Sequence, residues 1–313
     1  MIKIESLSKR FNGVRALNGL DMQVKTGSVY GFLGPNGAGK TTTLRILSGL
    51  ARTDKGRAWI MDQEVNLRSL GHRPLMGMLP EEPAFYPWMT PREYLRDFIA
   101  PLYRLDAKTA AKRTKETLEQ VGLSKAAKRR IGGFSRGMRQ RLGLAQALIP
   151  APSLLLLDEP VSALDPAGRR DVLELINNLR GQATILLSTH ILADVERVCD
   201  TVGIINQGRM VLESDRQELL DRYALPVFEI EVENDFSPWL EKLGRMSFVD
   251  QVQVKGHTIR VGVKDIHLAQ RELLNSLAAN GLLIRRFELT TPSLEDIFLK
   301  LTGEALPESS SGG

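Results

Sequence analysis

The sequence predicts an α/β protein with a mostly parallel sheet, followed by a smaller α+β domain. LLLLDE at 154–159 and ATILLSTH at 183–190 are apolar almost throughout, which is typical of strands buried on both faces. Segments of helical periodicity alternate with them, as expected when helices connect parallel strands. After Leu225-Pro226, VFEIEVEN and TIRVGV alternate apolar and polar residues and therefore predict strands with one buried face.

The first domain is expected to span residues 1–222. Its first 30 residues predict short strands with turns at Asn12-Gly13 and Thr26-Gly27. SVYGFLG at 28–34 then predicts a strand that leads through a glycine-rich loop into the helical segment TTLRILSGL. Residues from about 90 to 149 are mostly helical in pattern, with a break at Gly132-Gly133. Asp165-Pro166 can begin the next helix, because aspartate caps helices and proline fits their first turn.

The second domain is expected to span residues 223–303. IHLAQRELLNSLAANG predicts an amphipathic helix, LLIRRFELT a further strand and PSLEDIFLKLTG a last short helix. The tail, 304–313, is small and polar, so we expect it to be flexible. This domain has no catalytic constellation, and we expect an accessory or regulatory role for it.

The charge of the chain is modest overall but uneven along the sequence. The net charge is +5, which does not by itself call for nucleic acid. Between Pro91 and Ala145, however, there are 14 Lys or Arg residues and only 5 Asp or Glu residues. Two interpretations remain open for this basic region: solvated helical faces, or a surface that faces anionic lipid or phosphate.

The cysteine content and the hydropathy indicate the compartment. The single cysteine, Cys199, cannot form an internal disulfide and offers no metal-ligand spacing, which fits a reducing cytoplasm. MIKIESLSKRF lacks the apolar core of a signal peptide. No apolar run reaches the roughly 18 residues of a membrane span. Any work at a membrane is therefore expected to go through a partner.

The most specific motif is GPNGAGKT at 34–41, which fits the pattern G-x-x-x-x-G-K-[ST]. Glycines allow backbone N–H groups to converge on phosphate oxygens, and the following helix adds the positive end of its dipole. Lys40 can reach the β- and γ-phosphates, and the Thr41 hydroxyl can bind Mg²⁺. The residues predicted to contact the nucleotide here are Gly34, Pro35, Asn36, Gly37, Ala38, Gly39, Lys40, Thr41 and Thr42.

Two strand ends supply residues for phosphoryl transfer. Asp158 ends one apolar strand and is predicted to hold Mg²⁺, and Glu159 follows it as the group that orients or deprotonates the attacking water. His190 ends another strand, where it can hydrogen-bond a γ-phosphate and that carboxylate. Lys40, Glu159 and His190 are therefore the predicted catalytic residues.

Three further features leave their roles open. Phe11 can stack on a nucleotide base or belong to the core of the first strands. Phe85, Tyr86 and Trp88 lie in a proline-rich segment, GMLPEEPAFYPWMT, and can form either core or a docking surface for a partner. In FSRGMRQRLGLAQAL at 134–148, the residues Ser135, Gly137, Gln140 and Arg141 look suited to meet a phosphate, although no metal site adjoins them in the sequence.

Taken in order, these motifs resemble the ATP-binding subunit of an ABC transporter. GPNGAGKT is similar to the Walker A loop, LLLLDE to the Walker B strand, SALD at 162–165 to the D-loop and His190 to the switch histidine. FSRGM at 134–138 stands where the family has its LSGGQ signature. The resemblance covers about 1–222 and implies a P-loop NTPase fold of ABC type, with an N-terminal antiparallel subdomain and a helical subdomain.

The resemblance also implies partners and cofactors. In the family two such domains pair head to tail, so that one ATP lies between the phosphate loop of one and the signature of the other. Ser135, Gly137 and the D-loop Asp165 are then expected near a nucleotide, with ATP and Mg²⁺ as cofactors. A homodimer on the cytoplasmic face of the membrane, joined to separate permease chains, is the expected assembly, and no nucleic acid is expected. TPSLEDIFLKLTG resembles the end of bacterial drug-resistance ATPases, which favours export.

Three departures from the family pattern keep other readings open. Arg136 replaces a glycine, Met138 replaces a glutamine, and Glu81 stands where a glutamine usually senses Mg²⁺ and water. Glu81 can still bind the metal but adds negative charge. One alternative is therefore a weakly active or non-hydrolysing ATP switch, or half of a heterodimer. Another is an ABC-type ATPase acting on nucleic acid or ribosomes, although no coiled coil or cysteine pair separates Lys40 from Ser135.

Overall fold

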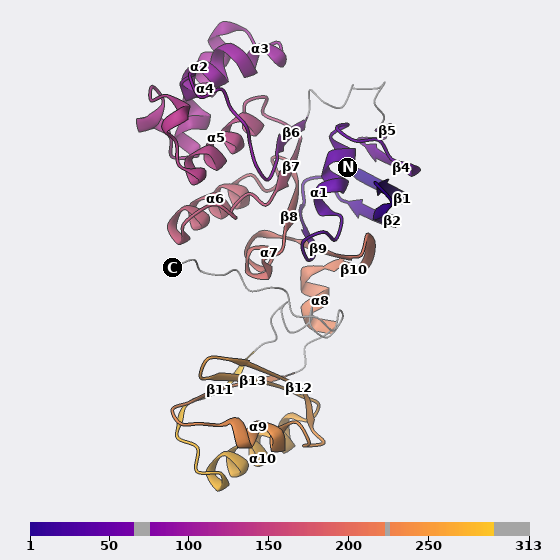
Figure 1. The fold of residues 1–313 in the computed structure, drawn as a ribbon, viewed down its shortest axis with the longest axis vertical. Helices are drawn as coiled ribbons and strands as arrows, with labels where there is room; N and C mark the ends of the chain where they lie inside the picture. Colours follow the sequence, from indigo (N-terminus) through magenta and orange to yellow (C-terminus); the bar gives the residue numbers. More distant parts are fainter. Residues whose placement is uncertain (66–75, 223–225, 291–313) are drawn as a thin grey trace. The chain divides into compact units, whose positions relative to one another are not determined.

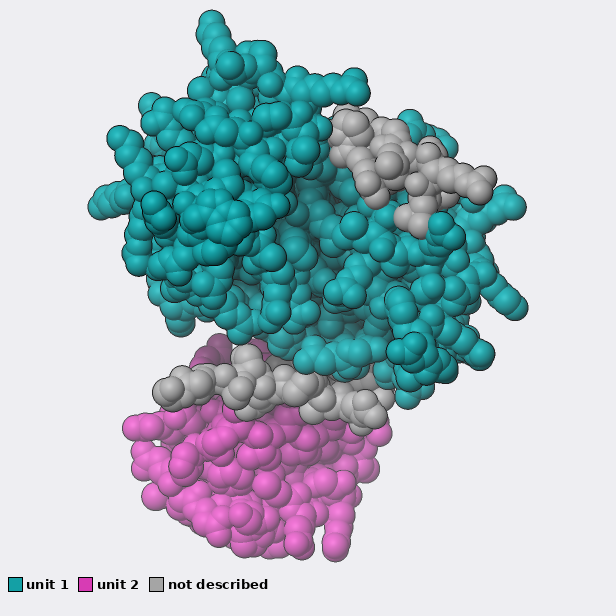
Figure 2. Space-filling view, turned by 45° about the horizontal axis from the view of Figure 1, so that its top comes forward, with its two compact units in different colours: residues 1–216, 304–313 teal, residues 217–303 magenta. Residues whose placement is uncertain are grey.

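The structure is a computed structural model in which residues 1–65, 76–222 and 226–290 are described (Figure 1). The chain forms two compact units, which meet in sequence between residues 216 and 217 (Figure 2). The predicted last helix, PSLEDIFLKLTG, and the tail 304–313 lie outside the described residues. No helix in the described ranges is long and apolar enough to cross a membrane.

The first unit is built on a six-stranded, mostly parallel sheet in the order β10-β9-β3-β8-β7-β6. Only the edge strand β10 runs antiparallel to its neighbour. The central strands β3, β7 and β8 are buried along their whole length, as their apolar sequences predict. The strands are β3 (Val29–Leu33), β6 (Met76–Leu79), β7 (Leu154–Asp158), β8 (Thr184–Thr189), β9 (Thr201–Asn206) and β10 (Arg209–Asp215).

A second, antiparallel sheet in this unit has the order β2-β1-β4-β5. Its strands are β1 (Ile2–Phe11), β2 (Val14–Val24), β4 (Lys55–Ile60) and β5 (Gln63–Glu64). The first two are 10 and 11 residues long, longer than the short strands expected from the sequence. Helix α1 (Lys40–Leu47) packs against both sheets, and their apolar side chains form one shared core.

Residues 90–149 are mostly helical, as the sequence predicts, but the helical segments before α4 are short and irregular. Thr90 caps α2 in a reciprocal arrangement with Glu93. The break at Gly132-Gly133 is a single tight turn, η4, just before α5. The elements are α2 (Pro91–Glu93), the π-helix η2 (Tyr94–Ile99), α3 (Ala100–Leu102), α4 (Ala107–Gln120), the short 3-10 helices η3 (Ser124–Ala126) and η4 (Ile131–Gly133), and α5 (Arg136–Leu148).

Two further helices, α6 (Pro166–Asn178) and α7 (Leu192–Val198), pack against each other beside the parallel sheet (Figure 1). Helix α7 contacts β3 closely at Gly31. A Cβ atom there would come within 2.8 Å of the Val195 side chain and 2.9 Å of the Cys199 sulfur. Glycine therefore sets the distance between this helix and the strand that leads into the phosphate loop. Helix α8 (Arg216–Arg222) follows β10.

The second unit has an antiparallel sheet in the order β12-β13-β11-β14, with its own apolar core. Its largest buried side chain is Trp239, whose indole N–H donates to Ser276 Oγ at 2.8 Å. Helices α9 and α10 cover one face of the sheet (Figure 1). The elements are β11 (Val227–Val232), α9 (Ser237–Leu243), β12 (Val249–Lys255), β13 (Thr258–Val263), α10 (Ile266–Ala279) and β14 (Ile284–Thr290).

Candidate active site

The glycine-rich loop joins the end of β3 to the start of α1, as the sequence predicts. Two of its glycines leave no room for a side chain. A Cβ at Gly34 would lie 2.3 Å from the Ile205 carbonyl oxygen. Gly39 has a φ of 115°, and its Cβ would lie 2.7 Å from the Ala16 carbonyl oxygen. Glycine at these two positions therefore lets the loop pack closely against β9 and β2.

A cavity of about 280 Å³ opens over this loop. Glu81 and Glu159, which are distant from the loop in sequence, contribute to its wall. The cavity therefore combines phosphate-binding backbone with a cation and two carboxylates. Its lining residues are Asn36, Gly37, Gly39, Lys40, Thr41, Thr42, Glu81 and Glu159.

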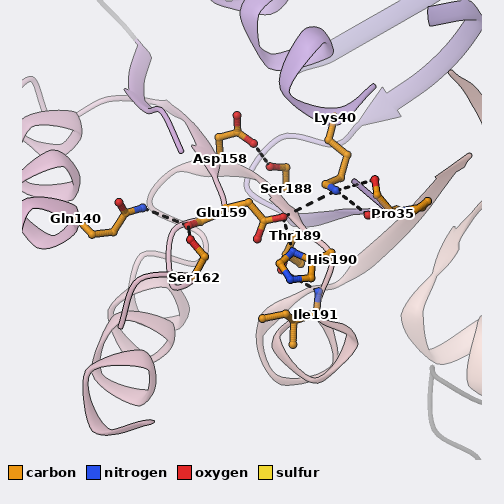
Figure 3. Close-up of polar contacts among 11 residues, drawn as sticks. Pro35, Lys40, Gln140, Asp158, Glu159, Ser162, Ser188, Thr189, His190 and Ile191 are labelled. Atoms are coloured by element: carbon orange, nitrogen blue, oxygen red, sulfur yellow. Dashed lines mark hydrogen bonds and ion pairs between the residues drawn. The ribbon is translucent and has the colours of Figure 1, made fainter. Parts of the chain in front are cut away.

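The Lys40 ammonium group is buried at the edge of this cavity. It donates to the carbonyl oxygens of Gly34 at 2.6 Å and Pro35 at 3.2 Å, and it lies 3.8 Å from Glu159 Oε1 (Figure 3). Burial lowers the pKa of Lys40, and the negative charge of Glu159 opposes this effect. A phosphate in the cavity would supply further negative charge to this cation.

Asp158 ends β7 directly beside Ser188 of β8, because the two strands pair in parallel register. Its carboxylate is 1% exposed and accepts hydrogen bonds from the hydroxyls of Ser188 and Thr41. Burial raises the pKa of Asp158, although these two hydrogen bonds act in the opposite direction.

Magnesium ions fit the oxygen donors gathered here. The Asp158 carboxylate is buried, touches the Thr41 hydroxyl and forms no ion pair with any cation in the described ranges. Glu81 adds a second carboxylate, on the wall of the cavity that Thr41 also lines. Hard divalent cations prefer such oxygen ligands, and a cation would offset the cost of burying the Asp158 charge.

Glu159 has an unusual backbone conformation, with a φ of 47°. Its N–H donates to the Ser188 carbonyl at 3.0 Å. Its own carbonyl oxygen accepts hydrogen bonds from the Ser162 hydroxyl at 3.1 Å and from the Gln140 amide at 3.2 Å (Figure 3). These contacts hold a conformation that costs about 1 kcal/mol or more for a residue with a side chain.

The two carboxylate oxygens of Glu159 differ in their partners. Oε1 lies 2.8 Å from His190 Nδ1, whereas Oε2 is buried and has no hydrogen-bond partner within the described chain. The hydrogen bond to Glu159 raises the pKa of His190, although partial burial opposes this. The arrangement fixes Glu159 through one oxygen and leaves the other available to a small polar ligand such as water.

Four predicted nucleotide contacts lie away from this cavity. Ser135 caps α5, accepting from the Met138 N–H at 3.2 Å, and Gly137 follows in the first turn. Asp165 caps α6 by accepting from the Gly168 N–H at 3.0 Å. Phe11 is 45% exposed at the end of β1, with the Lys9 ammonium 5.1 Å from its ring centroid, so it is not a core residue.

Gln140 and Arg141 do not face a phosphate as the sequence suggested. Gln140 is 2% exposed because α5 turns it inward, toward the Glu159 carbonyl oxygen. Arg141 donates to the Val121 carbonyl at 3.1 Å and to Asp171 at 3.2 Å. Both side chains therefore serve contacts within their own chain.

Sequence reasoning missed two groups that support the site. Ser188 bonds Asp158 across neighbouring strands, and only the strand register reveals this pairing. The buried carboxylate of Asp194 in α7 pairs with Arg169 in α6 at 2.7 Å, which connects the helix after Asp165 with the helix after His190. The available signal for this pair was the position of Asp194 among the apolar residues Leu192, Ala193 and Val195.

Comparisons with known proteins agree with this geometry. Residues 17–162 match the family described as ABC transporter, and residues 215–302 match the C-terminal domain described as ATP-binding protein DrrA1-3-like. The chain is 42% identical to an uncharacterized ABC transporter ATP-binding protein, YxlF, of Bacillus subtilis (strain 168), over 96% of this chain and 99% of that protein. It is 37% identical to the bacitracin transport ATP-binding protein BcrA of Bacillus licheniformis, over 97% of this chain and 97% of that protein.

A solved structure has the same architecture. An ATP-binding subunit of an ABC transporter aligns with a TM-score of 0.65 and 29% identity, covering 71% of this chain and 93% of that one. Members of this family work as dimers with membrane permease partners. The sequence, the fold and the phosphate-loop cavity thus agree, and the chain belongs to the ATP-binding proteins of the ABC transporter family, as an ATPase with a DrrA1-3-like C-terminal domain.

Proposed function

We propose that this ATPase is the motor of an exporter for an antibiotic-like compound. Two identical chains close around two ATP molecules, and hydrolysis reopens them to drive a separate permease at the cytoplasmic face of the membrane. Two similarities support export: the relative BcrA is named for bacitracin transport, and the second unit matches a DrrA1-3-like domain. The compound itself is recognised by the permease.

The phosphate loop and its neighbours bind the nucleotide in this proposal. Backbone N–H groups between Asn36 and Thr42 hold the phosphates, except that of Ala38, which donates to the Pro35 carbonyl at 3.2 Å, and Lys40 neutralises the β- and γ-phosphates. Thr41, Asp158 and Glu81 hold Mg²⁺, which would neutralise charge on the γ-phosphate. Because Glu81 is a carboxylate, it adds affinity for the metal at the cost of repulsion from the phosphates.

Glu159 activates the attacking water in this proposal. The observation that carries this assignment is its buried, unpartnered Oε2, on a side chain that lines the phosphate-loop cavity. His190 holds the opposite oxygen at 2.8 Å and so keeps the carboxylate in place. A general base needs this combination of fixed position and one free acceptor.

The partner chain completes each site. Ser135, Gly137 and Asp165 are absent from the wall of their own chain's cavity, and Ser135 and Asp165 are exposed at helix N-termini. Exposed N-termini with hydroxyl or small residues suit contacts with the γ-phosphate of an ATP bound to the other chain. Arg136, also exposed, adds a cation that the usual motif lacks. Phe11 is the stacking partner for the base in its own chain.

An aromatic surface beside Glu81 suits the permease. Trp88 is 63% exposed, and Tyr86 and Phe98 are also exposed. Tyr86 contacts both Trp88 and Phe98, with ring centroids 5.1 and 5.2 Å apart. Aromatic side chains with one exposed face are typical of interface cores. Because Glu81 precedes this surface by only a few residues, permease movement there can reach the metal site.

The decisive test replaces Glu159 with glutamine, which keeps its shape but removes its basicity. We expect Glu159→Gln to bind ATP as tightly as the unchanged chain and to hydrolyse it roughly 100-fold more slowly or worse. Glu174→Gln, an exposed change on α6, is the matched control and should keep normal turnover. Normal turnover in Glu159→Gln would remove Glu159 from its proposed role.

The proposed partners need a separate measurement. Tagged protein is isolated from gently solubilised native membranes, and the co-purifying chains are identified by mass spectrometry. A multi-span membrane protein with this chain as the only ATPase supports the homodimeric transporter. A second, different ATPase would replace the homodimer with a heterodimer, and a soluble machine or nucleic acid would overturn the transport assignment.

A further inference from the structure

A second cavity, of about 350 Å³, lies within the helical region between α2–η2 and α4. The two sides are close in Figure 1 and are joined by the Arg92 N–H, which donates to the Ala127 carbonyl at 3.2 Å. Residues 111, 114, 115 and 118 line it from α4, at the spacing of one helix face. This cavity shares no lining residue with the phosphate-loop cavity.

The charge of the lining is entirely positive. Arg92 and Arg96 approach from one side and Lys115 from the other, and no acidic residue lines the cavity. Arg96 is engaged with Asp97, at 2.6 and 2.8 Å, so its charge is partly neutralised. Within the described chain, neither Arg92 nor Lys115 forms an ion pair. Arg92 and Lys115, both exposed, thus line one cavity without a direct ion pair, although the charge of Arg92 also acts on the nearby Asp97 carboxylate. An anion bound between the two cations would reduce their mutual repulsion.

A buried hydroxyl in the same wall also lacks a partner. Thr114 is 2% exposed, and its Oγ1 makes no hydrogen bond in the described structure. Threonine in a helix commonly donates to a carbonyl one turn earlier, as Thr117 does to Arg113 at 2.9 Å. An unsatisfied buried hydroxyl costs stability, so its presence beside unpaired cations indicates an acceptor that is supplied from outside.

We propose that this cavity binds a phosphate group carried by a small molecule or a lipid headgroup. Arg92 and Lys115 would neutralise the phosphate, and the hydroxyls of Thr114 and Ser124 would donate to its oxygens. The side chains of Leu118 and Ala127 add an apolar wall for an organic substituent. The cavity is large enough for a phosphate with a short organic group. This site accounts for part of the basic excess between residues 91 and 145.

The test follows backbone amide signals of the isotope-labelled full chain during titration with inorganic phosphate. We expect saturable shifts at Thr114, Lys115 and Ser124, which report this cavity separately from the amides of the phosphate loop. Arg92→Gln with Lys115→Gln should weaken binding at these amides roughly tenfold or more. Lys108→Gln with Lys112→Gln removes the same charge from exposed positions on α4 and should leave the affinity unchanged.

Thr114→Val provides a second variant that retains the shape of the side chain. It should weaken phosphate binding while raising the melting temperature of the ligand-free chain, because a methyl group replaces an unsatisfied hydroxyl. Sodium chloride at matched ionic strength is the control for screening. Absence of saturable shifts, equal shifts with chloride, or undiminished shifts in the Arg92 and Lys115 double variant would each overturn the proposal.

Vesicles distinguish the two sources of the phosphate. Vesicles of phosphatidylcholine alone are compared with vesicles that also contain phosphatidic acid. Binding to phosphatidic acid that is lost in the Arg92 and Lys115 double variant, but kept in the Lys108 and Lys112 double variant, assigns the site to a lipid headgroup. Shifts with inorganic phosphate but no preference between vesicles assign it to a soluble phosphate compound. Both outcomes support the cavity as a phosphate site.

Discussion

Glu159 and His190 form a pair whose strength depends on pH. The hydrogen bond to Glu159 raises the pKa of His190, although partial burial opposes it. A pKa that is higher in the folded state means that the protonated histidine stabilises the fold. This contribution is fully present below the unfolded pKa, about 6.5, and is lost as pH rises through the folded pKa.

Replacing His190 with glutamine tests whether the protonated form of His190 stabilises the fold. We expect His190→Gln to lower the free energy of unfolding of the first unit most at pH values below about 6.5, and by less as the pH rises. Urea unfolding over a series of pH values measures the difference. His267→Gln, at an exposed position in α10, serves as the control. A loss that stays constant across the series would show that protonation of His190 does not stabilise the fold.

At the scale of elements, α5 links two parts of the ATPase. Its N-terminus carries Ser135 and Gly137, which we assign to the partner's nucleotide, and its buried face carries Gln140, which bonds the Glu159 carbonyl. A shift of this helix would therefore reach the backbone of the proposed base directly. The strained φ of Glu159 makes that backbone sensitive to the loss of one hydrogen bond.

Gln140→Met keeps the length of the side chain and removes its donor. We expect a several-fold lower kcat with little change in KM for ATP, and a loss of about 1 kcal/mol in stability. Steady-state ATPase assays and urea unfolding provide the two readouts. Gln120→Met, at an exposed position at the end of α4, is the matched control. A kcat equal to that of the control would mean that the hydrogen bonds with Ser162 and Ser188 are enough to hold the Glu159 backbone.

The elements also show what sequence patterns can and cannot predict. Apolar strands with polar ends predicted that Asp158, Glu159 and His190 would meet, because parallel strands bring their carboxyl ends to one edge. The sequence pattern wrongly predicted that Gln140 and Arg141 would meet a phosphate. The direction of these two side chains depends on which face of α5 packs inward, and the pattern does not show this. The pair of Arg169 and Asp194 was likewise hidden, because it requires the packing of α6 against α7.

At the scale of the whole molecule, each of the two units has an apolar core among the residues that the structure describes. The buried residues of the first core lie between Ile2 and Ile205 in the sequence, and those of the second lie between Phe228 and Leu282. The sequence predicted the boundary between the two domains near Leu225-Pro226, where apolar and polar residues begin to alternate. Units with their own cores can fold on their own. The described residues that line the phosphate-loop cavity all belong to the first unit.

A chain that ends at residue 222 tests whether the second unit is needed for the chemistry. We expect it to fold and to bind ATP as tightly as the full chain, because the phosphate loop, Asp158 and Glu159 all belong to the first unit. Circular dichroism establishes folding, and calorimetry compares the ATP affinities, with the Lys40→Ala full chain as the non-binding control. A weaker dimer with unchanged binding would give the second unit a role in assembly. A folded truncation that no longer binds ATP would show instead that the second unit shapes the nucleotide site.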